Sequence, residues 1–120
     1  MIDRASIESA AARIEGRVRV TPVAPLLHRD LGLPGEITLK LESLQRSGSF
    51  KARGAFNRIL TATPTHAGVI TASGGNHGAA VACAAADLNL PAEVFVPSVA
   101  SPTKIKRLQA YGAHVHVVGD

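Results

Sequence analysis

The sequence predicts an α/β fold, an open and twisted parallel sheet with helices on both faces. Short apolar runs rich in β-branched residues recur along the chain, at residues 36–42, 68–72, 91–97 and 114–118. Segments with helical periodicity, about 10 to 15 residues long, separate these runs. Strands that alternate with helices of this length form right-handed β-α-β units, and the strands of such units are parallel.

The N-terminal part begins with a predicted helix over residues 6–19, because its apolar side chains recur at spacings of three and four. Residues 21–35 contain three prolines, which force an extended, turn-rich path. Alternating apolar and polar side chains then predict a strand at 36–42, the first of the parallel sheet. Residues 1–35 are therefore a helix and a lead-in, and the α/β domain covers residues 36–120.

Each predicted helix of the second part follows a recognisable start signal. Ser49 is suited to be the N-cap of a helix that ends near Ala62 and buries an apolar stripe. The turn Ser73-Gly74-Gly75-Asn76 leads into a helix over residues 77–88. Ser101 followed by Pro102 starts a third helix, which stops at Gly112. The stripe of the first of these helices consists of Phe50, Ala55, Phe56, Ile59 and Leu60.

The composition argues against several classes of protein. The net charge is +4, yet the basic residues are scattered and only 3% of residues are aromatic, so nucleic-acid binding is not expected. No apolar run approaches the roughly 20 residues that span a bilayer, and the first residues lack the pattern of a signal peptide. Cys83 lies in an alanine-rich run and is expected to be a buried structural thiol. We expect a soluble, cytoplasmic protein.

Lys51 is the first candidate functional residue. It lies in the first turn of its helix, near the positive end of the helix dipole and beside Arg53. Repulsion by these charges and partial burial would disfavour the ammonium form. Such a position suits a neutral amine that attacks a carbonyl group. If the S-x-K motif stood alone, the more common interpretation would be that Lys51 and Arg53 are solvated side chains on an amphipathic helix.

The surrounding segment, ESLQRSGSFKARGA from Glu42 to Ala55, resembles the pyridoxal-phosphate attachment signature of the serine and threonine dehydratases. In that signature an acidic residue precedes S-x-S-F-K and then A-R-G-A, and the lysine forms the Schiff base. The resemblance implies a member of the dehydratase and serine-racemase branch of the fold type II pyridoxal-phosphate enzymes, which have a tryptophan synthase beta-like fold. Lys51 is then the catalytic residue and pyridoxal 5'-phosphate the cofactor.

The turn from Ser73 to Gly78 follows the next strand and should lie at the same edge of the sheet. Its small residues let backbone N–H groups approach an anion. The residues alone are also compatible with a glycine-rich turn that binds no ligand. Beside Lys51, the turn resembles the asparagine loop of the same family. The resemblance implies that Asn76 binds the cofactor's phenolic oxygen and that Phe50 lies against its ring. The residues implied to hold the substrate carboxylate are Ser73, Gly74, Gly75, Asn76 and His77.

The implied reaction is β-elimination of L-threonine or L-serine to 2-oxobutanoate or pyruvate, with release of ammonia. Gly74 favours elimination, because serine racemases carry a second acid/base serine at the matching position. Ala52 counts against enzymes of the cysteine-synthase kind and threonine synthases, which usually have aspartate after the lysine. The alternatives are a serine racemase, another fold type II enzyme, or an inactive binding or scaffold remnant of the fold.

The resemblance covers nearly all 120 residues but about the first third of a family member. The glycine-rich loop that grips the cofactor phosphate and the residue that faces the pyridine nitrogen are absent. We therefore expect residues 36–120 to be an incomplete cofactor-binding domain without its second domain, with little activity alone. At full length we expect a homo-oligomer, dimer or tetramer, that acts on a small amino acid and binds neither nucleic acid nor membrane.

Two further groups of polar residues are expected to have no role in binding or catalysis. His114 and His116 share one face of a strand, but no third ligand lies at metal spacing, so no metal site is expected. Lys104, Lys106 and Arg107 are interpreted as a solvated helix face.

Overall fold

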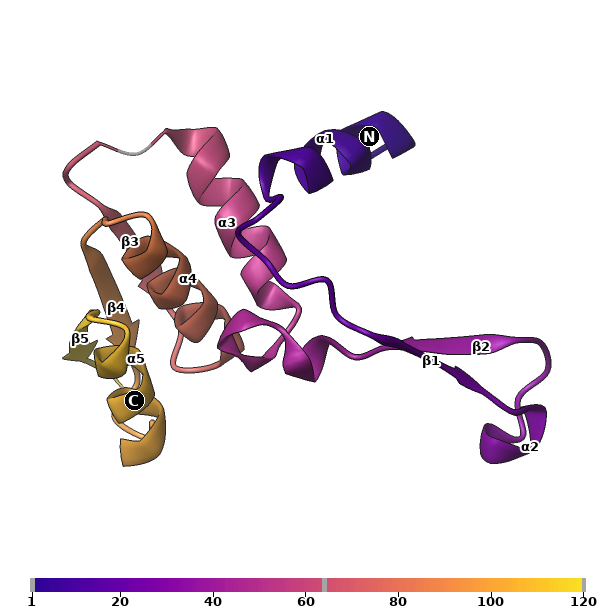
Figure 1. Cartoon of the computed structure of the whole chain (residues 1–120). Helices are drawn as coiled ribbons and strands as arrows, with labels where there is room; N and C mark the ends of the chain where they lie inside the picture. The colour runs from indigo at the N-terminus through magenta and orange to yellow at the C-terminus, as the bar shows by residue number, and fades with distance from the viewer. Residues whose placement is uncertain (1, 64, 120) are drawn as a thin grey trace.

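The computed structural model describes residues 2–63 and 65–119, apart from the side chains of residues 28 and 29. Helices and strands alternate through most of the chain (Figure 1). The elements, in order, are α1 (Arg4–Arg13), β1 (Val23–Leu26), α2 (His28–Leu31), β2 (Ile37–Lys40), the 3₁₀ turns η1 (Glu42–Leu44) and η2 (Arg46–Gly48), α3 (Lys51–Ala62), β3 (Val69–Ala72), α4 (Asn76–Asp87), β4 (Ala92–Val96), α5 (Pro102–Ala110) and β5 (His114–Val117).

The last three strands form the predicted parallel sheet, in the order β3-β4-β5. Val69 lies opposite Ala92 and Val94 lies opposite Val115, so the sheet advances by one strand with each β-α unit. The connections are α4 and α5, as the alternating pattern predicts. The parallel part of the prediction is confirmed for these strands.

The predicted strand at 36–42 does not join the parallel sheet. The observed strand, β2, is shorter than predicted and pairs with β1 in a separate antiparallel hairpin. In this hairpin Val23 lies opposite Lys40, and Leu26 lies opposite Ile37. A hairpin is the most local pairing open to a strand, and Pro25 is tolerated there because β1 has one neighbour. The first helix is also shorter than predicted, since α1 ends at Arg13 and Gly16 has a φ of +73°.

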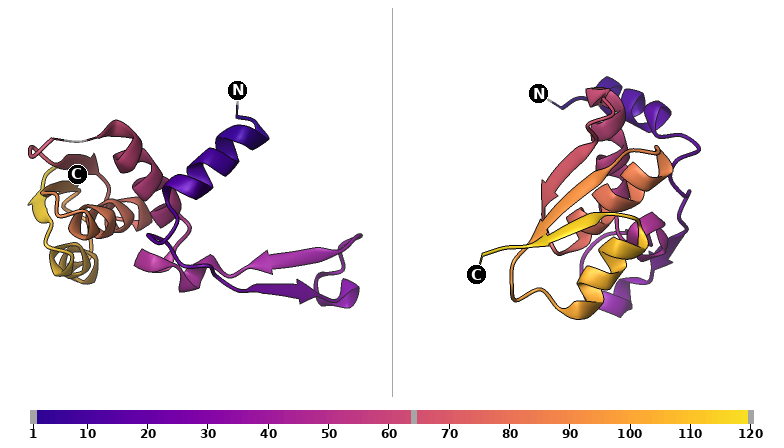
Figure 2. Two further views of the ribbon diagram at one scale, coloured as in Figure 1. Left: turned by 45° about the horizontal axis from the view of Figure 1, so that its top comes forward. Right: turned by 90° about the vertical axis from the view of Figure 1, so that its left-hand side faces the viewer.

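Among the described residues, helices cover one face of the parallel sheet, and the predicted helices on the other face are not seen. Side chains of β4 that point to this face meet α4 and α5 in one core. On the opposite face, in the described part of the chain, Ile70 is 72% exposed and no helix lies over it. The right-hand view of Figure 2 looks onto this uncovered face. The residues of the covered core are Ala79, Ala82, Ala85, Ala92, Val94, Val96, Leu108 and Ala113.

A second core joins α3 to α4. Phe56 is fully buried against alanines of α4, whose small side chains allow the two helices to approach closely. Cys83 of α4 is buried and unpaired, as predicted. The predicted stripe of α3 is wrong at one end, because Phe50 is 59% exposed rather than part of the core.

The hairpin of β1 and β2 projects away from the two cores (Figures 1 and 2). The Cα radius of gyration is 16.7 Å as a result, whereas about 13.6 Å is typical of a compact domain of this length. Among the described helices, none is long and apolar enough to cross a membrane.

Candidate functional site

The turn before α3 holds its residues in unusual backbone conformations. Ser47 and Gly48 both have positive φ, at 55° and 67°, and Ser49 returns to an extended backbone. The helix begins at Lys51, so Phe50 and not Ser49 is its N-cap residue. The Ser49 hydroxyl still accepts a hydrogen bond from the Lys51 amide, at 3.4 Å. The predicted cap is therefore displaced by one residue, while Ser49 still serves the first turn of α3.

The side chain of Lys51 is exposed to solvent. The partial burial that the sequence predicts for it is therefore not observed in the described part of the chain. Its Nζ lies 5.2 Å from the centroid of the Phe50 ring, a cation–π distance. Arg53, expected to repel Lys51, instead forms an ion pair with Glu42, at 2.7 Å between Nη2 and Oε1. Its charge is thus balanced locally. The amine stands open to solvent with an exposed aromatic ring beside it.

A polar network that sequence reasoning missed fastens the lead-in to the turn. Glu42 accepts hydrogen bonds from the Thr21 hydroxyl and from two nitrogens of Arg53. Gln45, 2% exposed, accepts from the Arg19 amide and donates to the Arg19 carbonyl. The hydrogen bonds from Arg53 lower the pKa of the Glu42 carboxyl to about 2. These bonds fix the path of residues 42–49 ahead of Lys51.

Replacing Glu42 by glutamine should destabilise the chain near neutral pH and progressively less in acid. The folded-state pKa of Glu42 is lowered, so its stabilisation is complete above about pH 4.5 and is lost as the pH falls towards about 2. Urea unfolding at several pH values, followed by circular dichroism, measures the difference from the unchanged chain. Glu36→Gln, at an exposed position, is the matched control and should show no such trend. A constant difference down to about pH 2 would contradict the assignment.

The second predicted turn joins β3 to α4. Gly75 is the N-cap residue of α4, and no side chain of the described residues caps the helix, so the first N–H groups of the helix lack a capping partner. The Ser73 hydroxyl accepts from the Gly75 amide at 3.3 Å. Asn76 and His77 are exposed in the first turn. This arrangement offers backbone donors and one side-chain amide to an anionic ligand.

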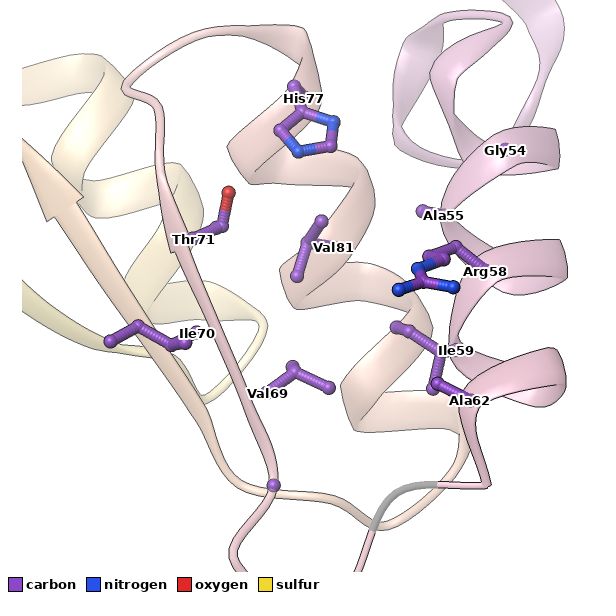
Figure 3. A pocket seen from close by; sticks show the side chains of 11 residues that line it. Gly54, Ala55, Arg58, Ile59, Ala62, Val69, Ile70, Thr71, His77 and Val81 are labelled. Carbon is purple, nitrogen blue, oxygen red and sulfur yellow. The ribbon is translucent and has the colours of Figure 1, made fainter.

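The structure brings the two turns to one edge of the fold. In Figure 3, α3 and α4 run side by side in the same direction, since Gly54 and His77 lie at one end of the pair and Ala62 at the other. The carboxyl end of β3, marked by Thr71, points to the end with Gly54 and His77. Both helix N-termini therefore lie where ligands bind in parallel α/β sheets.

Arg107 is exposed, as the interpretation of a solvated helix face predicts, but it also links the two turns. Its guanidinium donates to the Ser47 carbonyl, and it also borders a cavity of about 50 Å³ with Gly74, Gly75 and Asn76. Lys104 borders the same cavity, three residues earlier on α5. The sequence shows that these two residues share a helix face, because they are three apart, but it does not show what that face contacts. Lys51 is not among the residues that border this cavity.

A larger cleft, of about 290 Å³, lies between α3, α4 and the free edge of β3 (Figure 3). Most of its lining is apolar, and His77 lies at its upper end. The lining residues are Gly54, Ala55, Arg58, Ile59, Ala62, Gly68, Val69, Ile70, Thr71, His77 and Val81.

The residues present fit the cofactor implied by the resemblance. The end of α3 offers an exposed primary amine and an exposed aromatic ring, and the end of α4 offers uncapped N–H groups and an amide. A Cβ built on Gly74 would meet Val96 and Ala100 at 3.5 and 3.6 Å, ordinary contact distances. Glycine at this position is therefore not forced by lack of space, and its lack of a proton-carrying side chain has chemical consequences.

Comparison with known proteins agrees with this chemistry. The family described as "Pyridoxal-phosphate dependent enzyme" matches residues 14–120. The chain is 42% identical to an L-threonine ammonia-lyase of Geobacter sulfurreducens, over 99% of the chain and 30% of that protein. Among solved structures, it resembles maize serine racemase (TM-score 0.87, 36% identity, 98% of the chain and 36% of the other). It also resembles the serine racemase of Dictyostelium discoideum (TM-score 0.85, 36% identity, 94% and 38%). The chain thus spans about a third of the length of these relatives.

Proposed function

Since the chain belongs to the family of pyridoxal-phosphate dependent enzymes, we propose that it is part of a threonine or serine dehydratase. The observation that carries this proposal is the position of Lys51 and of the turn 73–78 at the same edge of the fold, on two parallel helices. The 42% identity to an L-threonine ammonia-lyase supports the substrate class. The proposed reaction converts L-threonine to 2-oxobutanoate and ammonia, and L-serine to pyruvate and ammonia.

Each residue of the two turns would have its own role in the proposed reaction. When bound, pyridoxal phosphate supplies an aldehyde that captures an amine and a ring that withdraws electrons. The Lys51 amine would hold the cofactor and, once the substrate amine replaces it, take the proton from the substrate α-carbon. Phe50 would lie against the ring. The Asn76 amide would donate to the phenolic oxygen, while Ser73, Gly74, Gly75 and His77 would hold the substrate carboxylate with Asn76.

Gly74 favours elimination over racemisation. Elimination needs one base on one face of the substrate, and Lys51 provides it. Racemisation needs a second proton carrier on the opposite face, which a glycine cannot be. The alternative is a serine racemase, which the likeness to the maize enzyme favours. Chiral chromatography of serine after incubation with enzyme separates the two, since only racemisation yields D-serine.

We propose the same division of the chain as the sequence suggests, with residues 36–120 as part of a small cofactor-binding domain. The hairpin pairs residues on both sides of position 35, so residues 23–26 accompany this domain. We further propose that the protein is a cytoplasmic homo-oligomer. Light scattering of the purified protein measures the oligomeric state.

Covalent trapping tests the role of Lys51. The 120-residue chain is incubated with pyridoxal phosphate and reduced with borohydride, and its peptides are analysed by mass spectrometry. The cofactor should be attached to Lys51, because this amine lies at the start of α3 beside the Phe50 ring, which the other exposed lysine of the control lacks. Lys106→Ala, at an exposed position of α5, should leave the labelling unchanged, whereas Lys51→Ala should remove it. Labelling spread evenly over the surface lysines would contradict the proposal.

A further inference from the structure

Two neighbouring strands on the uncovered face of the sheet bring three potential metal ligands together. His114 and His116 alternate along β5, so both side chains point to this face. Glu93 of β4 lies directly opposite His114 in the parallel register. The sequence alone offers no third ligand for the two histidines. The structure corrects this, because the third ligand comes from the adjacent strand rather than from the same one.

The ligand atoms are close enough to share one ion. One atom from each of Glu93, His114 and His116 lies within 4.8 Å of the others. The Glu93 Oε2 contacts the His116 Nε2 directly and lies 3.4 Å from the His114 Nδ1. Bonds of about 2.1 Å in tetrahedral geometry separate two zinc ligands by about 3.4 Å. The pair of Glu93 and His114 already has this separation, and the contact of Glu93 with His116 has to widen.

The surroundings hold these side chains in place. The ring of Phe95 stacks on His116, at 4.5 Å between centroids and 16° between planes, and the two histidine rings lie 4.5 Å apart. The backbones are fixed by the β4–β5 ladder, and sites on strands are more precise than sites on loops. The His114 side chain is 70% exposed, so an ion can enter from solvent.

The chemistry of the three ligands selects the ion. Two imidazoles and one carboxylate suit Zn²⁺ and neighbouring first-row divalent ions, whereas Mg²⁺ and Ca²⁺ prefer oxygen ligands. Three protein ligands leave a fourth position for water.

We propose that Glu93, His114 and His116 form a binding site for Zn²⁺ or a similar divalent transition-metal ion, which clamps β5 to β4. The site is separate from Lys51 and from the turn at 73–78, since it lies on the sheet face opposite to α4. The clamp would stabilise the sheet at its outer strand, because an ion that binds only the folded chain favours folding.

Calorimetric titration of the untagged 120-residue chain with zinc chloride tests this site. The chain should bind one zinc ion, and His114→Ala and His116→Ala should each weaken binding at least ten-fold. His66→Ala, at an exposed histidine in a turn, is the matched control and should bind like the unchanged chain. Failure to bind zinc, or equal binding by His114→Ala, would overturn the proposal.

A second measurement guards against variants that fold poorly. His114 is largely exposed, so His114→Ala should keep the circular dichroism spectrum of the unchanged chain. Zinc should raise the melting temperature of the unchanged chain and leave that of His114→Ala unchanged. A zinc-dependent rise of equal size in both chains contradicts the site. These experiments contain no pyridoxal phosphate, so their outcome is independent of the proposed dehydratase function.

Discussion

Replacing Lys51 by alanine should lower the turnover of L-threonine at least about a thousand-fold, because the variant loses both the amine that holds the cofactor and the base for the α-proton. The chain spans about a third of its relatives, so the assay uses a chimera. In it, the 120 residues replace the matching segment of the Geobacter sulfurreducens L-threonine ammonia-lyase, to which they are 42% identical. The measurement is the rate of 2-oxobutanoate formation.

The control for this prediction is Lys106→Ala in the same chimera. Lys106 is an exposed lysine of α5 that borders neither of the cavities near the two turns. Its replacement should leave the turnover within about two-fold of the starting chimera, as surface substitutions usually do. An active Lys51→Ala chimera would remove the central residue of the proposal. A chimera that converts L-serine mainly to D-serine would move the assignment to racemisation.

Replacing Gly78 by alanine should lower the free energy of unfolding by about 3 kcal/mol. A Cβ on Gly78 would lie 1.9 Å from the Ser73 carbonyl oxygen. Because that oxygen belongs to the backbone, it cannot move without a change in the backbone. Ser73 would have to move away from the first turn of α4, so the turn 73–78 would change its backbone conformation and the fold would lose stability. Urea unfolding of the two chains, followed by circular dichroism, measures the difference.

Gly54→Ala is the matched control for Gly78→Ala. Gly54 also lies within a helix, but nothing lies within 4 Å of the Cβ that alanine would add. Alanine restricts the unfolded chain more than glycine does, so this variant should be as stable as the original or gain up to about 1 kcal/mol. If both variants unfold at the same urea concentration, the close approach of Ser73 to α4 is not a constraint on the fold.

Local sequence signals predicted the elements of the second part of the chain. The bounds of α4, β4 and α5 lie within two residues of the predicted ranges. Apolar periodicity, the glycines of the turn at 73–78 and the Ser101-Pro102 start signal are all readable from neighbouring residues. The turns around Lys51 and Asn76 were identified for the same reason, since each combines a short motif with the end of one strand or the start of one helix.

Partners across the fold were not predictable in this way. The pattern at 36–42 indicates a strand but does not say whether it pairs with β1 or with β3. The third ligand of the histidine pair required the register of β4 against β5. Likewise, Arg107 meets the turn before α3 across 60 residues of sequence, and no local spacing encodes that contact.

The parallel course of α3 and α4 sets the reach of the electric field at the candidate site. Each helix start carries about half of a positive elementary charge, and here the two add on the same side instead of cancelling. Salt at physiological strength screens such a field beyond about 8 Å. An anion such as a phosphate or carboxylate is therefore not drawn in from afar but is turned into position over its last few ångströms of approach.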